Sequence, residues 1–195
     1  MDLALDAGQD VSDDALLIAY GNGDTGAARL LMLRLTPRVL GFATRMLGGN
    51  RSEAEDVTQE AMLRLWKIAP DWRQGEAKVT TWLDRVVSNL CTDRLRKTRN
   101  VSIDTVPEPL DGSPGVEAGL QQAARVAALD AALADLPDRQ RQAVILRHIE
   151  GFANPEIAQM MDIGVEAVES LTARGKRALT AVLAGRRAEL GYEDG

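Results

Sequence analysis

The sequence predicts an all-α fold of two small helical domains joined by a flexible linker. Aromatic residues make up only 4% of the 195 residues, and Ala, Leu, Arg and acidic residues dominate, which favours helices over sheets. Apolar residues recur at helical spacing in two separate blocks. Between these blocks, residues 98–119 contain three prolines and three glycines without helical periodicity, which is typical of a linker.

The N-terminal block, residues 12–97, follows an acidic tail at residues 1–11. Ser12 is suited to cap its first helix, and the GNGD run at 21–24 ends that helix. Pro37 indicates a kink or junction in the second helix, and Ser52 with Glu55 forms a capping box for the third. Residues 69–75 are predicted to be a loop. The four predicted helices span residues 13–20, 25–47, 52–68 and 78–97.

The C-terminal block, residues 120–190, also predicts four helices. A Leu-Pro-Asp break at 136–138 separates the first two, and Gly151 ends the second. Asn154 as N-cap and Pro155 in the first turn begin a third, short helix. The predicted helices span residues 121–134, 139–150, 155–161 and 165–183.

The formal net charge of −6 is unevenly distributed along the chain. Residues 1–28 contain six Asp, residues 101–120 contain four acidic residues, and neither segment contains Lys or Arg. Residues 29–100 instead contain 14 basic and 8 acidic residues. Because the acidity is concentrated in the tail and the linker, the overall charge does not exclude nucleic-acid binding.

Several classes of protein are disfavoured by the composition. No stretch approaches the ~20 apolar residues of a membrane span, and the acidic N-terminus lacks the basic region of a secretory signal, so we expect a cytoplasmic protein without membrane insertion. A single cysteine, Cys91, and a single histidine, His148, exclude a disulfide framework and a multi-ligand Cys/His zinc site. The carboxylates accompany no clustered base or nucleophile, so we expect no catalytic residue, metal, cofactor or small-molecule substrate.

The strongest local pattern predicts a helix-turn-helix in the C-terminal block. Ala158 is small enough for a close helix crossing, and Ile163 lies in a short turn before Val165, Val168 and Leu171, which predict the inner face of the second helix. The outer face would enter the DNA major groove, where Arg174 can contact guanine and Lys176 and Arg177 can neutralise phosphates. A basic, solvated face on a helical hairpin is the alternative. The predicted outward positions are Glu166, Glu169, Ser170, Ala173, Arg174 and Arg177.

A polar stripe on the helix at 52–68 is the second candidate surface. Asp56, Gln59, Glu60 and Leu63 follow the i, i+3, i+4, i+7 spacing of one helix face, opposite the apolar Val57, Ala61, Leu65 and Ile68. Such a stripe can bind a basic helix of a partner, although an ordinary solvated face has the same pattern.

The helix at 78–97 combines aromatic and basic residues. Trp66, Trp72 and Trp82 precede a basic end that contains Arg94, Arg96, Lys97 and Arg99, and Asn89 lies in mid-helix. This combination is typical of binding to single-stranded or melted DNA. The alternatives are that Trp82 packs in the core and that the basic residues complement the helix dipole.

These three segments, in this order, resemble the extracytoplasmic-function (ECF) sigma factors of bacterial RNA polymerase. The matching stretches are AEDVTQEAMLRLWK (54–67), TTWLDRVVSNLCTDRLRK (80–97) and the segment from Leu133 to Leu179. The resemblance extends over about residues 12–183. It implies a promoter-recognition factor without covalent chemistry, whose partners are core RNA polymerase (β′ clamp helices and β flap), promoter DNA and an anti-sigma factor.

The resemblance also implies roles for individual residues. Asp56, Gln59, Glu60 and Leu63 would bind core polymerase. The minus-ten element would be contacted by Trp72, by Asn89 beside the pocket for a flipped base, and by Arg94, Arg96 and Lys97 on the DNA backbone. The minus-thirty-five element would be contacted by Glu169, Ser170, Arg174, Lys176 and Arg177.

The chain departs from the family pattern at several positions. Glu169 replaces a frequently basic residue and can accept a hydrogen bond from cytosine N4, which predicts an uncommon minus-thirty-five sequence. Lys78 and Val79 stand where aromatic residues are frequent. Asn154-Pro155 replaces a more usual polar start of the first helix of the helix-turn-helix, and Asp162 stands where glycine is common.

Three other classes remain as alternatives. A sigma-like decoy would bind an anti-sigma factor but not core polymerase, and the polar stripe argues against it. A stand-alone helix-turn-helix regulator would bind duplex DNA by itself and would not need the aromatic and basic helix at 78–97. An enzyme is disfavoured because no catalytic cluster is present.

Overall fold

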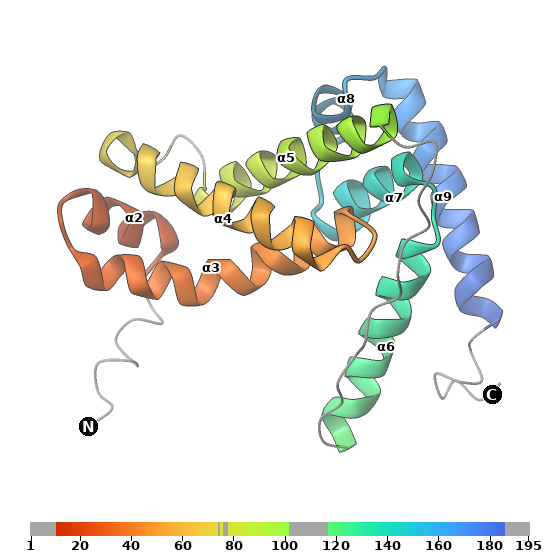
Figure 1. Cartoon of the computed structure of the whole chain (residues 1–195), viewed down its shortest axis with the longest axis horizontal. Helices are drawn as coiled ribbons and strands as arrows, with labels where there is room; N and C mark the ends of the chain where they lie inside the picture. Colours follow the sequence, from red (N-terminus) through yellow and green to blue (C-terminus); the bar gives the residue numbers. More distant parts are fainter. Residues whose placement is uncertain (1–10, 74, 76–77, 102–116, 186–195) are drawn as a thin grey trace. The chain divides into compact units, whose positions relative to one another are not determined.

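The computed structural model of the chain describes residues 11–73, 75, 78–101 and 117–185, and within this part all regular secondary structure is helical (Figure 1). The predicted all-α class is therefore confirmed. The acidic tail at 1–10 and most of the predicted linker lie outside the described residues. No described helix has both the length and the apolar character that crossing a bilayer requires.

The chain divides into two compact units. The first contains Met1–Ala43 and Ser52–Cys91, and the second contains Thr44–Arg51 and Thr92–Gly195. The N-terminal helices are α2 (Asp13–Gly21), α3 (Thr25–Met46), α4 (Arg51–Ile68), the short 3₁₀ helix η1 (Ala69–Asp71) and α5 (Val79–Val101). The C-terminal helices are α6 (Glu117–Ala134), α7 (Asp138–Val144), the π-helical turn η2 (Ile145–Ile149), α8 (Asn154–Met161) and α9 (Val165–Gly185).

Local capping explains where several of these helices begin. The Ser12 hydroxyl accepts a hydrogen bond from the Ala15 backbone N–H at 3.2 Å, which confirms Ser12 as the N-cap of α2. Helix α3 continues through Pro37. The prediction that Asn154 caps α8 is wrong, because Ala153 occupies the N-cap and the Glu156 carboxylate accepts from the Ala153 N–H at 3.0 Å.

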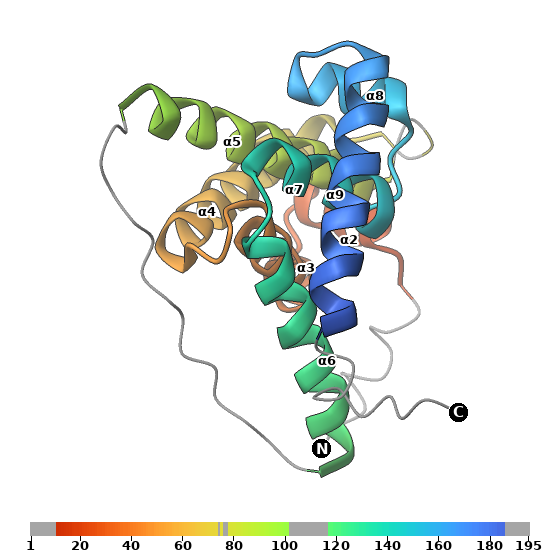
Figure 2. The same cartoon turned by 90° about the vertical axis from the view of Figure 1, so that its right-hand side faces the viewer.

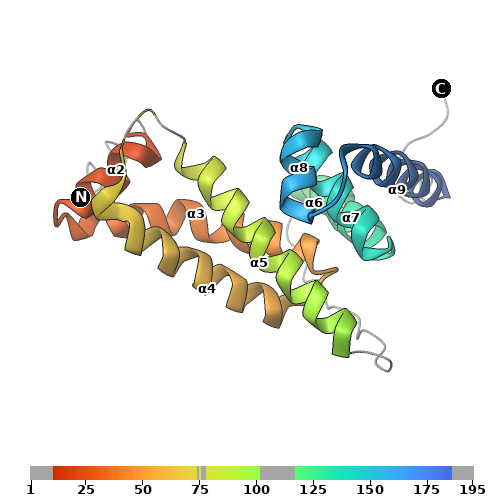
Figure 3. The same cartoon turned by 90° about the horizontal axis from the view of Figure 1, so that it is seen from above.

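Helices α3, α4 and α5 run in alternating directions, as Figures 1 and 3 show. Their apolar faces form a core around Leu31, Phe42, Leu65 and Leu83, all of which are fully buried. Val57, Ala61 and Leu65 are likewise fully buried and Ile68 is half-buried, so the predicted inner face of α4 is confirmed at three of its four positions. Cys91, on α5, is fully buried, as a small core residue would be.

An ion pair joins α3 to α5 at the edge of this core. The Arg38 guanidinium donates to the Asp84 carboxylate at 2.6 Å, and the Asp84 side chain is almost completely buried. Burial raises the pKa of the Asp84 carboxyl above its usual value, and the hydrogen bond and positive charge of Arg38 oppose that shift. Removing Arg38 alone would leave a buried carboxyl group without this partner.

The second unit is organised around α9, which contacts α6, α7 and α8 and runs beside α6 in Figure 2. The predicted helix at 139–150 is α-helical only as far as Val144 and continues as the π-helical turn η2. The Glu150 N–H donates to the Ile145 carbonyl at 3.0 Å, which is the wider spacing of a π turn, and Gly151 then takes a positive φ of 79°. Sequence periodicity did not indicate this turn.

Gly175 permits the close approach of α9 to α7. A Cβ atom added at Gly175 would lie 2.6 Å from Val144 Cγ2 and 3.1 Å from the Gln140 carbonyl oxygen. Val is stiff at χ1 in a helix, and the carbonyl belongs to the backbone, so neither neighbour moves aside easily. A methyl group at position 175 would therefore force the two helices apart.

We expect Gly175→Ala to destabilise the protein even though alanine is the better helix former. Overpacking costs about 1–3 kcal/mol, whereas the gain in helix propensity is at most about 1 kcal/mol. Gly41→Ala is the matched control, because Gly41 is also helical and an added Cβ there meets nothing within 4 Å. Calorimetric unfolding should show a lower Tm for Gly175→Ala and an unchanged or higher Tm for Gly41→Ala; equal shifts would contradict the packing argument.

Candidate polymerase and nucleic-acid interfaces

The predicted polar stripe lies on the outer face of α4. Asp56, Gln59 and Leu63 are exposed and Glu60 is partly exposed, whereas Val57, Ala61 and Leu65 on the opposite face are buried. Leu63 has 54% of its surface exposed, so it presents an apolar side chain to solvent beside the polar residues. The stripe is therefore a polar surface with one apolar end.

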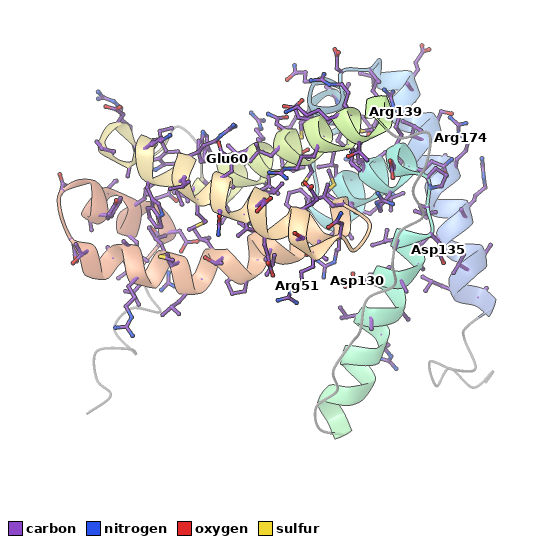
Figure 4. The ribbon with its side chains drawn as sticks, in the orientation of Figure 1. Arg51, Glu60, Asp130, Asp135, Arg139 and Arg174 are labelled. Carbon is purple, nitrogen blue, oxygen red and sulfur yellow. The ribbon has the colours of Figure 1, made fainter. Side chains whose placement is uncertain are left out.

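Glu60 is held along the helix by a neighbour. The Arg64 Nε donates to the Glu60 carboxylate at 2.9 Å, and both side chains are about half exposed (45% and 44%); Figure 4 labels Glu60 on α4. An exposed i, i+4 pair contributes only about 0.3–0.5 kcal/mol to stability. A partner can exchange this pair for its own basic group at little energetic cost.

The aromatic residues before α5 have separate packing partners. Trp66 packs edge-to-face on Tyr20 of α2, with ring centroids 4.9 Å apart. Trp72 follows η1 and packs edge-to-face against Trp82 on α5, with centroids 6.2 Å apart. Trp72 and Trp82 are both half-buried, so each retains an accessible surface. The alternative that Trp82 packs in the core is therefore only partly confirmed.

The polar residues of α5 do not all lie on one face. Asn89 is exposed, and Arg96, seven residues later, returns to nearly the same side of the helix. The Arg96 guanidinium donates to Asp93 at 2.8 Å. Arg94 is only partly exposed, on a different side from Asn89, while Lys97 is exposed. The structure therefore aligns Asn89 with Arg96 and separates Arg94 from them.

In the C-terminal block, α8 and α9 form the predicted helix-turn-helix. Ile157, Ala158 and Met161 of α8 and Val168 of α9 are buried, and the turn between the helices contains Asp162 with a positive φ of 52°. Asp is one of the few residues other than Gly that adopt this conformation readily. Asp162 can therefore occupy the position at which the resemblance predicts glycine.

The outer face of α9 agrees with the prediction at every outward position. All six residues that were predicted to point outward are exposed, and Lys176 is exposed as well. Lys176 points to a flank of this face. The inner face was predicted less well: Val168 is buried and Leu171 is half-buried, but Val165 is 39% exposed because it lies in the first turn of α9. The six exposed residues of the outer face are Glu166, Glu169, Ser170, Ala173, Arg174 and Arg177.

Two side chains on this surface have defined hydrogen bonds. The Arg174 Nε donates to the Ser170 carbonyl of the same helix at 3.3 Å, and Figure 4 labels Arg174 on α9. The Asn154 amide donates to the Glu169 carboxylate at 3.4 Å, a long bond that joins α8 to α9. Asn154 and Glu169 each depart from the family pattern, but their pairing was not predicted from sequence.

The described residues contain no group of three or more His, Cys, Asp or Glu side chains arranged to hold a metal ion. The surfaces above offer carboxylates, amides, guanidinium groups and aromatic rings. Such groups bind proteins and nucleic acids by hydrogen bonding, stacking and charge.

Comparison with known proteins assigns both helical blocks to the same family. Residues 31–101 match Sigma-70 region 2, and residues 127–179 match Sigma-70, region 4. The ECF RNA polymerase sigma factor SigM of Mycobacterium tuberculosis is 32% identical over 175 residues, which cover 88% of this chain and 85% of SigM. The chain belongs to the ECF sigma factors.

Other relatives agree with this assignment. The ECF sigma factor SigE of Mycolicibacterium smegmatis is 33% identical over 78% of this chain, and the match spans 60% of SigE. SigW of Bacillus subtilis is 32% identical over 69% of this chain and 77% of SigW. Sigma factors are non-enzymatic transcription initiation factors, and this chain belongs to that class.

Two solved structures share the fold. CnrH, in complex with the cytosolic domain of CnrY, aligns with a TM-score of 0.54 at 24% identity over 90% of this chain and 99% of CnrH. The sigma factor RpoE of Bartonella quintana, in complex with the anti-sigma factor NepR, aligns with a TM-score of 0.55 at 21% identity over 78% of this chain and 94% of RpoE.

Proposed function

We propose that this sigma factor binds core RNA polymerase, directs it to specific promoters and helps to melt the DNA there. Residues 12–97 would form the domain that binds polymerase and the minus-ten element, and residues 120–190 the domain that binds the minus-thirty-five element. Residues 98–119 would link them, after an acidic tail at 1–11. The observation that carries this proposal is the family membership of both blocks, each with an exposed surface of matching chemistry.

The α4 stripe is the proposed polymerase surface. Asp56, Gln59 and Glu60 present carboxylate and amide groups to solvent, and Leu63 adds an exposed apolar side chain. Interfaces that bind tightly combine an apolar anchor with a polar rim. The β′ clamp helices of core polymerase are the proposed partner of this surface, and the β flap is the proposed partner of the C-terminal domain.

The minus-ten surface is proposed to run from Trp72 along α5. An aromatic ring such as Trp72 can stack on an unstacked base, Asn89 can hydrogen-bond to a base edge, and Arg94, Arg96 and Lys97 can neutralise phosphates. Capture of unstacked bases would offset the few kcal/mol that each opened step costs. The exposure of Asn89 and its alignment with Arg96 support this assignment.

The minus-thirty-five surface is proposed to be the outer face of α9. Arg174 can contact guanine O6 and N7 through its terminal nitrogens, while Lys176 and Arg177 can contact phosphates. Ser170 lies one turn before Arg174 on the same face. Glu169 can accept from cytosine N4, which predicts cytosine in the recognised sequence.

Regulation by an anti-sigma factor is part of the proposal. The two solved structures named above each contain a protein partner: CnrH was solved with the cytosolic domain of CnrY, and RpoE with the anti-sigma factor NepR. We infer that a protein partner also holds this chain inactive until a stress or another signal releases it. The site of action would be the bacterial cytoplasm, where core polymerase is present.

Transcription with purified core RNA polymerase and fragmented genomic DNA of the source tests the proposal. We expect discrete new transcripts whose upstream sequences share two elements. A variant with Asp56, Gln59 and Glu60 all changed to Ala should lose these transcripts and its association with core polymerase, while its helicity by circular dichroism stays the same. If the wild-type chain neither binds core polymerase nor yields transcripts, the proposal is wrong.

A further inference from the structure

A single carboxylate at the start of α2 connects three parts of the N-terminal block. Asp14 lies in the first turn of α2, and its Oδ1 accepts a hydrogen bond from the Trp72 indole Nε1 at 3.2 Å. The same Oδ1 accepts from the backbone N–H of Val79 at 3.3 Å. These donors lie 58 and 65 residues further along the chain.

The two donors lie at the two ends of the segment that joins η1 to α5. Trp72 is the residue after η1, and Val79 is the first residue of α5 and is fully buried. The first N–H groups of a helix have no partner within that helix, so the Val79 N–H needs an acceptor from elsewhere. Asp14 supplies it, and its negative charge also suits the N-terminal end of the α5 dipole.

The same contact fixes the orientation of the Trp72 ring. The indole N–H points to Asp14, and the ring packs edge-to-face on Trp82 in the first turn of α5, with an interplanar angle of 78°. A tryptophan held only by ring packing can turn about its side-chain bonds. With its N–H bound to a carboxylate that also binds α5, the exposed part of the ring keeps one position relative to α5.

The neighbouring carboxylate has a different partner, which shows that the contact is specific to Asp14. Asp13 forms an ion pair with Arg34 of α3 at 3.1 Å, and Arg34 also donates to the Val11 carbonyl at 2.8 Å. Asp13 thus ties α2 to α3, whereas Asp14 ties α2 to Trp72 and α5. The two residues have the same charge and adjacent positions but separable roles.

We propose that Asp14 is a positioning residue for promoter melting: it holds Trp72 and the first turn of α5 in the arrangement that receives unstacked minus-ten DNA. This inference rests on the proposed function, because it assigns Trp72 and α5 to that DNA. A surface that is already ordered avoids the entropy cost of becoming ordered when DNA binds. Asp14 therefore acts through Trp72 and α5 and does not contact DNA.

The test measures promoter opening by holoenzyme on a promoter mapped in the transcription experiment. Asp14→Ala removes the acceptor for both hydrogen bonds, and we expect about tenfold slower opening with unchanged affinity for core polymerase. Asp14→Asn keeps an amide oxygen at the same place and should restore most of the rate, because the acceptor matters more than the charge. Asp13→Ala is the matched control and should open the promoter at the wild-type rate.

A second measurement follows the contact itself without transcription. The indole N–H resonance of Trp72 in the free chain, assigned by its loss in Trp72→Phe, should shift and exchange faster with solvent in Asp14→Ala but not in Asp13→Ala. Trp72→Phe keeps an aromatic ring but removes the hydrogen-bond donor, so it should also slow promoter opening. In the Trp72→Phe background, the further change Asp14→Ala should slow opening by a smaller factor than Asp14→Ala does in the wild-type chain.

The proposal is overturned if Asp14→Ala opens the promoter like the wild type, if it loses core affinity in parallel with opening, or if Asp13→Ala has the same effect. An unchanged Trp72 resonance in Asp14→Ala overturns it as well. If wild-type holoenzyme opens no promoter, the proposed function is wrong, and the Trp72 resonance still reports whether Asp14 holds the ring.

Discussion

Leu63→Ala weakens binding to core polymerase about tenfold and leaves the stability of the free sigma factor unchanged. The reason is the position of Leu63: with 54% of its surface exposed, it contributes little to the core but offers an apolar anchor to a partner. Truncation of such an anchor commonly costs more than about 1 kcal/mol of binding free energy. Binding can be measured by fluorescence anisotropy of the labelled chain titrated with core polymerase.

Leu65→Ala is the matched control, with the opposite expected result. Leu65 is on the same helix but fully buried, so its truncation should lower the free energy of unfolding by about 2–5 kcal/mol. At a temperature where the variant remains folded, its affinity for core polymerase should be close to that of the wild type. Equal affinity of Leu63→Ala and the wild type would exclude Leu63 from the interface.

Arg174→Ala reduces transcription from promoters with the cognate minus-thirty-five element about tenfold or more. Removing a bidentate bond to guanine costs about 1–3 kcal/mol of discrimination. Arg174 is exposed on the outer face of α9 and donates a hydrogen bond to the Ser170 carbonyl of its own helix, so the substitution should not disturb the fold. Binding to core polymerase should therefore be unchanged.

A second substitution separates base recognition from simple charge. Arg177→Ala removes the same charge from the same face. Because the proposed contact of Arg177 is to a phosphate, its loss should reduce transcription from all promoters to a similar extent. On a promoter in which the contacted guanine is replaced, Arg174→Ala and the wild type should give equal transcription. Arg177→Ala should still reduce transcription from that promoter. If Arg174→Ala and Arg177→Ala respond to the base change in the same way, the assignment of Arg174 to base recognition is wrong.

Much of the local structure follows from short-range patterns in the sequence. The apolar spacing of α4 predicted its buried face and left Asp56, Gln59 and Leu63 outside, as observed. The Ser12 cap was also predictable from a short-range pattern, because the Ser12 hydroxyl and the Ala15 N–H that it binds lie within one turn of the chain. Such features depend on residues a few positions apart, and these are visible in one sequence.

Other local features depended on the surroundings. Val165 fits the inner spacing of α9 but is 39% exposed, because it is the first residue of the helix. The second helix of the C-terminal block ends in a π turn before Gly151, although its sequence is compatible with a regular helix. The close approach of Gly175 to Val144 and Gln140 was likewise not visible, since the residues around Gly175 do not specify which helix packs against it.

The all-α class, the order of the helices, the helix-turn-helix and the outward faces of α4 and α9 were predictable from the amino-acid order alone, because each depends on periodicity and capping within one segment. Two sets of contacts became visible only in the folded chain: Asp14 holds Trp72 and Val79, and Asn154 pairs with Glu169. These contacts join residues that lie far apart along the chain. Their physical cause is the packing of separate helices, which brings a donor to an acceptor at a distance that no local pattern specifies.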